Sequence, residues 1–127
     1  MNLYMNGKGK YISTNYLTFQ RGSDFDQTSP ANTWVFVDER EDSINNGYFA
    51  VNVVPSYAIV DFPASYHNGA AGLAFADGHV ESHLWVENST IPRFQPGTSL
   101  NLNSKFTSAT DRDMKWLVER TTVKLSN

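Results

Sequence analysis

The sequence predicts a single α+β domain, with an antiparallel β-sheet around a central hairpin and a helix near the C-terminus. Three observations support this fold class: the apolar run Trp34–Val37, two alternating runs joined by Asp77-Gly78, and a helical apolar pattern that follows Thr110. A chain of 127 residues has the length of one domain that folds without covalent cross-links. We therefore treat residues 1–127 as one soluble domain.

The composition excludes several classes of function. The chain has no cysteine, which excludes disulfides, thiolate nucleophiles and Cys-ligated zinc or iron–sulfur sites. The formal net charge is -3 with 10 Lys and Arg residues, so the sequence lacks the basic surface expected of a nucleic-acid-binding protein. No apolar run approaches the roughly 18–20 residues of a membrane-spanning helix.

The predicted strands before the hairpin differ in the strength of their signal. Trp34–Val37 is β-branched and aromatic on both faces, so we expect a buried central strand. It ends in Asp38–Asp42, a charged run that we place outside the core. Weaker strand signals lie in Tyr48–Val54, which follows an Asn-Gly turn, in Tyr57–Phe62, which lies between two prolines, and in Tyr11–Phe19.

The alternating runs on either side of Asp77-Gly78 predict a β-hairpin. An Asp-Gly pair favours a two-residue turn of the primed type, which would pair Ala76 with His79 and Phe75 with Val80. Because side chains alternate between the faces of a strand, this register sorts the residues into two sets. The expected core face holds Leu73, Phe75, Val80 and Leu84; the expected outer face holds Ala74, Ala76, His79, Glu81 and His83.

The C-terminal segment predicts an amphipathic helix. Thr110 is a suitable N-cap, and Asp111 and Asp113 lie in the first turn, where the helix dipole favours acids. The expected buried face consists of Met114, Leu117, Val118 and Thr121.

His67 precedes Asp77-Gly78 with nine residues between the His and the Asp, an H-x9-D-G pattern. The stretch from His67 through Glu81 resembles the pseudopilin-like family of exported bacterial proteins, which is named for a prepilin-type N-terminus and this signature. Two other segments agree with the resemblance. Ser29–Glu39 is similar to the family's buried strand that ends in Asp-Glu, and Asp113–Leu117 is similar to its Asp-x-x-Trp-Leu stretch. These segments follow in order over roughly Met1 to Thr122.

The resemblance implies a pilin-like head domain and a non-catalytic structural subunit of a cell-envelope assembly of the pilus or type II secretion kind. Family members begin with a short basic leader and a long hydrophobic helix. The chain shows neither, so we expect an exported head whose inner-membrane anchor is absent here. Expected partners are other pseudopilin or envelope-assembly subunits, and the signature residues are His67, Asp77 and Gly78.

The hairpin also offers candidates for metal binding or a polar clasp. His79, Glu81 and His83 share one strand face and form a candidate zinc or divalent-metal site, with His67 or Asp77 nearby. Polar residues at these positions also suit the wet face of an ordinary hairpin. We expect a hydrogen bond between His67 and Asp77 to pin the loop before the hairpin to its tip, because no motif places a nucleophile beside this pair.

Two further candidates lie outside that pair. Asp38, Glu39, Glu41 and Asp42 supply the oxygen ligands that Ca²⁺ prefers, although a solvated charged loop explains the same cluster, so we expect no cofactor and keep calcium as the alternative. Trp85 falls on the expected outer face, where an aromatic ring suits a glycan. The alternatives to a structural subunit are therefore an extracellular polysaccharide-binding module that uses Trp85 and a small metal-dependent hydrolase that uses His67, His79, Glu81 and His83.

Overall fold

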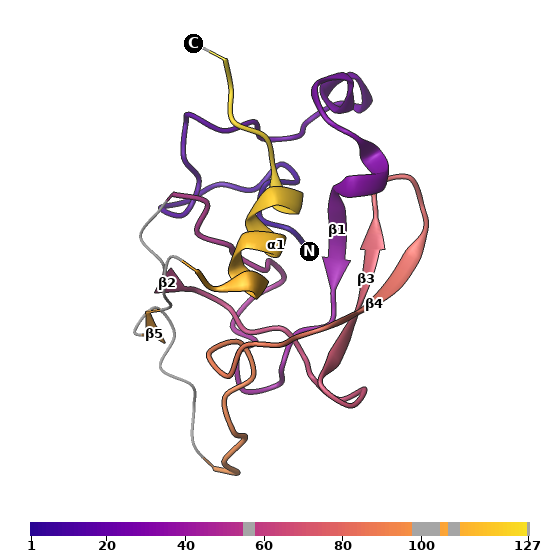
Figure 1. Cartoon of the computed structure of the whole chain (residues 1–127). Helices are drawn as coiled ribbons and strands as arrows, with labels where there is room; N and C mark the ends of the chain where they lie inside the picture. Colours follow the sequence, from indigo (N-terminus) through magenta and orange to yellow (C-terminus); the bar gives the residue numbers. More distant parts are fainter. Residues whose placement is uncertain (55–57, 98–104, 107–109, 127) are drawn as a thin grey trace.

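The computed structural model describes residues 1–54, 58–97, 105–106 and 110–126, and Figure 1 shows the arrangement of their helices and strands. In chain order these are the 3-10 helices η1 (Gly22–Gln27) and η2 (Pro30–Asn32), the strands β1 (Trp34–Val37), β2 (Ala58–Ile59), β3 (Ala70–Phe75), β4 (Val80–Leu84) and β5 (Lys105–Phe106), and the helix α1 (Arg112–Thr121). Among these described residues, no helix is both long and apolar enough to cross a lipid bilayer.

The main sheet is antiparallel with the strand order β1-β3-β4, and β2 and β5 form a separate antiparallel pair. The predicted α+β class, with a hairpin and a C-terminal helix, agrees with this architecture. The central strand is β3, however, and β1 lies at an edge, so the prediction of a central Trp34–Val37 strand is wrong. Trp34 is fully buried but Phe36 is 55% exposed, because one face of β1 is turned away from the core.

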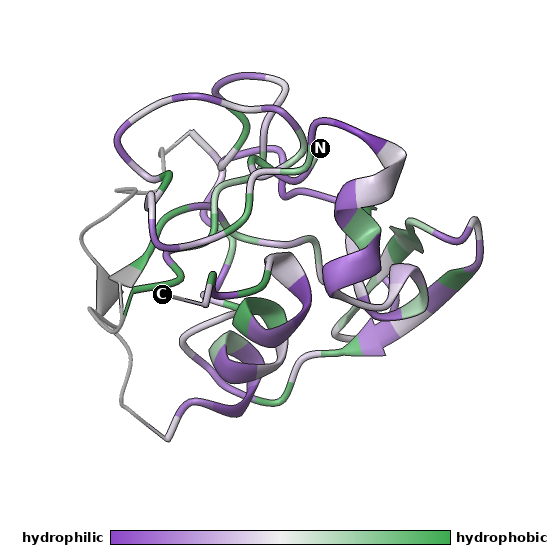
Figure 2. Ribbon diagram, turned by 90° about the horizontal axis from the view of Figure 1, so that it is seen from above, coloured by the Kyte–Doolittle hydropathy of each residue, from purple (hydrophilic) through white to green (hydrophobic). Residues whose placement is uncertain are grey.

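The helix α1 packs on the inner face of the sheet (Figure 1). It begins one residue later than predicted, because Asp111 rather than Thr110 is the N-cap and accepts a hydrogen bond from the Met114 N–H at 2.9 Å. The ribbon of α1 in Figure 2 carries both apolar and polar residues, as expected of an amphipathic helix. Met114, Leu117 and Thr121 of the predicted face are buried and Val118 is partly buried, so this prediction is confirmed.

Two of the three weaker strand predictions fail for a common reason: these segments are held by irregular contacts instead of a ladder, whereas the third is confirmed in part. Tyr48–Val54 contributes buried side chains, yet Phe49 makes only an isolated bridge with Asn2. Tyr11–Phe19 likewise forms isolated bridges. Of Tyr57–Phe62, Ala58–Ile59 forms β2, and Tyr57 lies outside the described residues.

The hairpin lies where the sequence places it, but its register differs by one residue. Ala74, not Phe75, lies opposite Val80. The N–H of Phe75 donates to the His79 carbonyl at 2.9 Å, and the N–H of Gly78 donates back to the Phe75 carbonyl at 2.9 Å. The loop therefore has three residues and closes with Gly78 at a φ of 93°. Glycine supplies the positive φ that this loop type needs at its last position.

A shift of one residue moves every side chain of a strand to the opposite face. On β3, Leu73 and Phe75 are buried as predicted. On β4 the predicted faces are reversed: Val80 is 72% exposed and Leu84 is 57% exposed. Their placement in the core is wrong, and Glu81 and His83 share the inner face of the sheet instead.

Candidate functional site

The two ends of the H-x9-D-G signature lie at opposite ends of β3. His67 and Ala70 exchange backbone hydrogen bonds of 3.4 and 3.1 Å, which form a tight turn just before the strand. Asp77 lies in the loop after the strand. The six residues of β3 between them span about 17–20 Å. The predicted hydrogen bond between His67 and Asp77 is therefore wrong, since a strand separates the two residues.

Asp77 instead forms a charged cluster with its neighbours on the hairpin. Its carboxylate accepts a hydrogen bond from the His79 N–H at 3.1 Å and contacts the His79 ring Nδ1 at 2.5 Å. Nε2 of the same ring lies 3.4 Å from Glu81 Oε2, and the ring stacks on Phe75 with centroids 4.4 Å apart. The contact with Asp77 raises the pKa of His79, and the hydrogen bonds from His79 lower the pKa of Asp77. The cluster is an exposed ion pair that closes the loop.

His83 has different partners. Its ring stacks on Trp116 of α1 with centroids 3.7 Å apart and meets Trp85 edge-on at 4.7 Å. The Arg120 guanidinium lies over the Trp116 ring, 4.5 Å from its centroid. Burial lowers the pKa of His83, which favours the neutral ring.

The candidate metal site of His79, Glu81 and His83 is consequently not assembled. The three side chains share a strand face, as predicted, but His79 and Glu81 contact each other while His83 stacks on Trp116. Within the described part of the chain, no group of three or more His, Asp or Glu side chains is arranged to hold a metal ion. The same finding applies to the proposed use of His67 in a metal-dependent hydrolase.

The acidic side chains that follow β1 do not converge on one point. The candidate calcium site of Asp38, Glu39, Glu41 and Asp42 is therefore not formed. Asp38 accepts a hydrogen bond from the Gly72 N–H at 3.2 Å. Glu39 accepts one from the Ser43 hydroxyl at 3.0 Å. Glu41 is exposed. The carboxylates of Asp38, Glu39 and Asp42 therefore have three different partners, and the Glu41 side chain is exposed.

Asp42 takes part in a buried ion pair that contradicts the placement of the whole charged run outside the core. Arg40 is only 3% exposed. Its Nε and Nη2 donate to the two carboxylate oxygens of Asp42 at 2.9 and 2.8 Å, and Nη1 donates to the Pro92 carbonyl. The bidentate geometry satisfies both charges, which is what allows them to be buried.

Two more acids lie in partly or fully buried positions. Desolvation raises the pKa of Glu39 to about 7. Burial also raises the pKa of Asp61, whose Oδ2 accepts a hydrogen bond from the Ala50 N–H at 2.6 Å. Asp61 was not predicted as a buried group, although an acid within the apolar run Tyr57–Phe62 is a visible signal in the sequence.

Trp85 is the clearest correction at the candidate binding surface. It is 2% exposed, and its indole Nε1 donates to the Ala64 carbonyl at 2.9 Å. The expectation of an exposed glycan-binding ring is wrong, because the register of β4 directs Trp85 into the core. Because Trp85 is buried, the hairpin has no exposed tryptophan of the kind that the predicted polysaccharide site requires.

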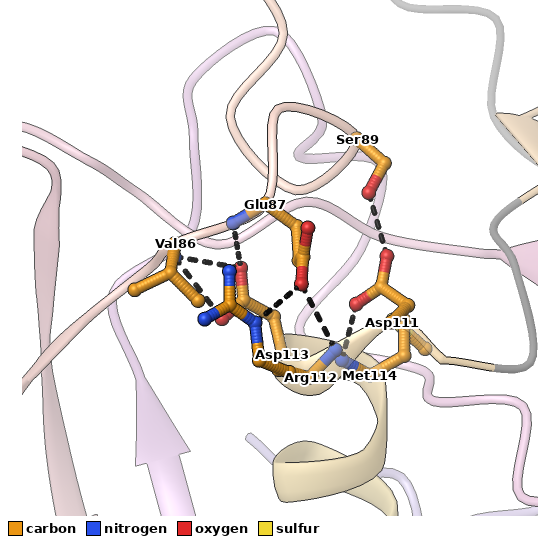
Figure 3. Close-up of polar contacts among 7 residues, drawn as sticks. All are labelled: Val86, Glu87, Ser89, Asp111, Arg112, Asp113 and Met114. Atoms are coloured by element: carbon orange, nitrogen blue, oxygen red, sulfur yellow. Dashed lines mark hydrogen bonds and ion pairs between the residues drawn. The ribbon is translucent and has the colours of Figure 1, made fainter.

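A polar cluster at the start of α1 joins the helix to the chain that leaves β4 (Figure 3). The carboxylate of Asp113 is buried and accepts hydrogen bonds from the backbone N–H of Val86 at 3.0 Å and of Glu87 at 2.9 Å. Asp111 accepts from the Ser89 hydroxyl at 2.6 Å, and Arg112 pairs with Glu87 at 2.8 Å. The sequence pattern of Asp113 indicates only a favourable interaction with the helix dipole, because its backbone partners lie 26 and 27 residues away.

A separate hollow of about 360 Å³ lies between the N-terminal loops and the segment around the Asn-Gly turn. Its lining combines aromatic, amide and charged side chains, including Lys8, Lys10, Tyr11, Asn45, Tyr48 and Asp61. The Lys10 ammonium lies 4.9 Å from the centroid of the Tyr11 ring. Such a mixture of rings and hydrogen-bonding groups can contact a polar ligand.

Scans against protein-family models, curated proteins and solved structures each return no match for this chain.

Proposed function

We propose that this chain is the head of a non-catalytic structural subunit, exported and anchored in the cell envelope, within an assembly of the pilus or type II secretion kind. Under this proposal the α+β domain is a pilin-like head, and its loops contact other envelope-assembly subunits. The observation that supports the proposal is where the signature residues lie: the His67 backbone forms the turn before β3, Asp77 and Gly78 form the loop after it, and none of the three lines the hollow described above.

The spacing of the signature follows from the length of β3. The turn at His67 begins the strand, and the loop with Asp77 and Gly78 ends it. Nine intervening residues are what a six-residue strand requires together with the end of one turn and the start of the next. The histidine and the aspartate are therefore far apart in space, because the whole of β3 lies between them.

The Asp-x-x-Trp-Leu stretch has a comparable role. Asp113 fixes the chain after β4, Trp116 covers His83, and Leu117 is part of the core. All three side chains are thus used in joining α1 to the hairpin. Side chains that already pack or hydrogen-bond within the fold favour a structural role, because a catalytic or binding side chain needs a face that is open to its ligand.

The test is to express the native gene, with a C-terminal tag, in its own bacterium. The proposal predicts that the protein is recovered in the envelope fraction, that N-terminal sequencing shows removal of a prepilin-type leader, and that cross-linking captures other envelope subunits. A matched pair of variants, Gly78→Val and Gly47→Val, tests whether contacts with other subunits can be lost while the protein stays in the envelope fraction. We expect the first to lose cross-links while it stays in the envelope, and the second to behave as the wild type. Recovery of the wild-type protein in the cytoplasm with no leader removed would refute the proposal.

The hollow beside the Asn-Gly turn favours a second candidate, a polysaccharide-binding module. Tyr11 and Tyr48 are partly exposed there and replace Trp85 as the rings that would contact a sugar. A glycan array tests this candidate, with Tyr48→Ala as the variant and Tyr66→Ala, an exposed tyrosine outside the hollow, as the control. Absence of binding by the wild-type chain, or equal binding by both variants, would remove it.

A further inference from the structure

The outer edge of β4 presents unpaired backbone groups. The hydrogen bonds from Phe75 to the His79 carbonyl and from Trp85 to the Gly69 carbonyl mark the residues that bond to β3. Since bonded residues alternate along an antiparallel strand, Glu81 and His83 bond inward, and Val80, Ser82 and Leu84 direct their N–H and C=O groups away from the sheet. No described residue pairs with that side of β4.

The opposite edge of the sheet, along β1, has a backbone partner. There the Asn2 N–H donates to the Val35 carbonyl at 2.8 Å, so the N-terminal segment covers β1. In Figure 1, β4 forms the rim of the sheet, and no described segment lies along it. An edge strand of five residues with exposed Val80 and Leu84 has none of the prolines or outward lysines that usually protect such an edge.

The sequence of β4 complements itself when two copies run antiparallel. Ser82 is the middle residue of β4, and its backbone N–H and C=O are among those directed away from the sheet. A two-fold axis at Ser82 therefore pairs all five residues of the strand with the second copy. This register places Val80 opposite Leu84 of the second copy, as backbone-bonded pairs, and it places Glu81 opposite His83 of the second copy. The latter are non-bonded pairs, in which the side chains lie closest together.

Both kinds of side-chain pair are favourable. Val80 and Leu84 bury apolar surface that is exposed in the single chain. The ring of His83 stacks on Trp116 but has no hydrogen bond within the described part of the chain, and the carboxylate of Glu81 is exposed and can supply an acceptor. Like charges do not face each other anywhere in this register.

We propose that two copies of this chain associate through the β4 edge, antiparallel and centred on Ser82, so that the two main sheets become one continuous sheet. The interface is isologous and closes on itself, so it yields a dimer rather than a filament. The inference stands apart from the proposed envelope function, because it depends only on the edge geometry and the sequence of β4.

The experiment combines sedimentation velocity with amide hydrogen exchange by NMR on the full chain, from about 10 µM to about 1 mM. We expect the sedimentation coefficient to rise with concentration. Over the same range the amides of Val80, Ser82 and Leu84 should become protected, and those of Glu81 and His83, which already bond to β3, should change little.

Ser82→Pro removes the central outward N–H and should weaken association at least about tenfold. Leu84→Lys is a second variant that keeps the backbone intact and should have a similar effect. The control is Phe36→Lys, which makes the same kind of change on the exposed face of β1 and should leave association unchanged. Circular dichroism verifies that each variant is folded.

Three outcomes would overturn the inference: a wild-type chain that stays monomeric at about 1 mM, a dimer that both β4 variants retain, or a dimer that Phe36→Lys abolishes. The last result would show that the copies stack through the exposed sheet face instead of joining edge to edge. Protection of amides elsewhere, with Val80, Ser82 and Leu84 unchanged, would likewise exclude the β4 interface.

Discussion

Replacement of Asp113 by asparagine isolates the anchor between α1 and the segment after β4. The buried carboxylate accepts hydrogen bonds from two backbone N–H groups, those of Val86 and Glu87. Both N–H groups donate to Oδ2, and the Val86 N–H also donates to Oδ1 at 3.2 Å. Asparagine can present its oxygen in the place of Oδ2, but its NH₂ then replaces Oδ1 and cannot accept from the Val86 N–H, and the two remaining hydrogen bonds are no longer to a charged group. We expect these losses together to cost roughly 1.5–3 kcal/mol. Removal of the acid from the first helical turn adds about 0.3–1 kcal/mol. We expect Asp113→Asn to lower the free energy of unfolding by about 2–4 kcal/mol.

The matched control is Asp111→Asn, which removes the same charge two positions earlier. Asparagine is as good an N-cap as aspartate, and the hydroxyl of Ser89 can accept from an amide as readily as it donates to a carboxylate. Its expected cost is below about 1 kcal/mol. Urea unfolding followed by circular dichroism measures both variants. If Asp113→Asn costs no more than Asp111→Asn, the two backbone N–H groups do not depend on this carboxylate and the reasoning fails.

Three further predictions concern the core, the loop and a buried acid. Phe75→Ala should lower the unfolding free energy by roughly 3–5 kcal/mol, because the buried ring leaves a cavity; a loss below about 1 kcal/mol in urea unfolding would contradict its place in the core. Gly78→Val should cost about 1–3 kcal/mol, because valine resists a φ of 93°, whereas Gly47→Val, in open space and without a positive φ, should cost clearly less; equal melting temperatures would refute this account of the loop. Burial raises the pKa of Glu39 from 4.5 to about 7, so the folded chain retains a proton that the unfolded chain releases, and stability should fall as pH rises from about 4.5 to 7. Glu39→Gln should flatten that part of the stability profile, and a wild-type profile that rises over the same window would exclude Glu39 as the dominant group.

The elements with strong local signals were predictable from the sequence. The helix pattern of Met114, Leu117 and Thr121 gave the correct buried face, because one amphipathic stripe contacts the core whatever the rest of the fold is. The position of the hairpin was also correct. The segments around Phe49 were not predictable, since they are buried by contacts with residues far away in the sequence and not by a ladder of their own.

The error in the hairpin has a specific physical origin. Asp77-Gly78 suits both a two-residue primed turn and a three-residue loop with glycine last, and the two differ by one residue in register. The pattern on β4 cannot decide between them, because Val80 and Leu84 alternate with Glu81 and His83 in either case. The structure selects the loop that buries Trp85 and brings His83 against Trp116, and it leaves the two aliphatic side chains outside.

The candidate sites were less predictable than the fold. Sequence spacing placed His79, Glu81 and His83 on one face correctly, yet it could not show that Trp116 takes one of them as a stacking partner. In the same way, the run Asp38–Asp42 did not reveal that Arg40 is buried with Asp42. Partners that lie far away along the chain decide whether polar side chains converge on a ligand or on one another.

The amide of Asn2 joins β1 to the end of α1, since its Nδ2 donates to the carbonyls of both Trp34 and Thr121 at 2.9 Å. The Trp34 indole also donates to the Thr121 hydroxyl at 3.2 Å, across 87 positions of sequence. During synthesis this junction can close only after α1 has been made, so the Trp34 ring lacks this cover until then. Contacts between segments so distant in sequence form late, because the loop between them must close first.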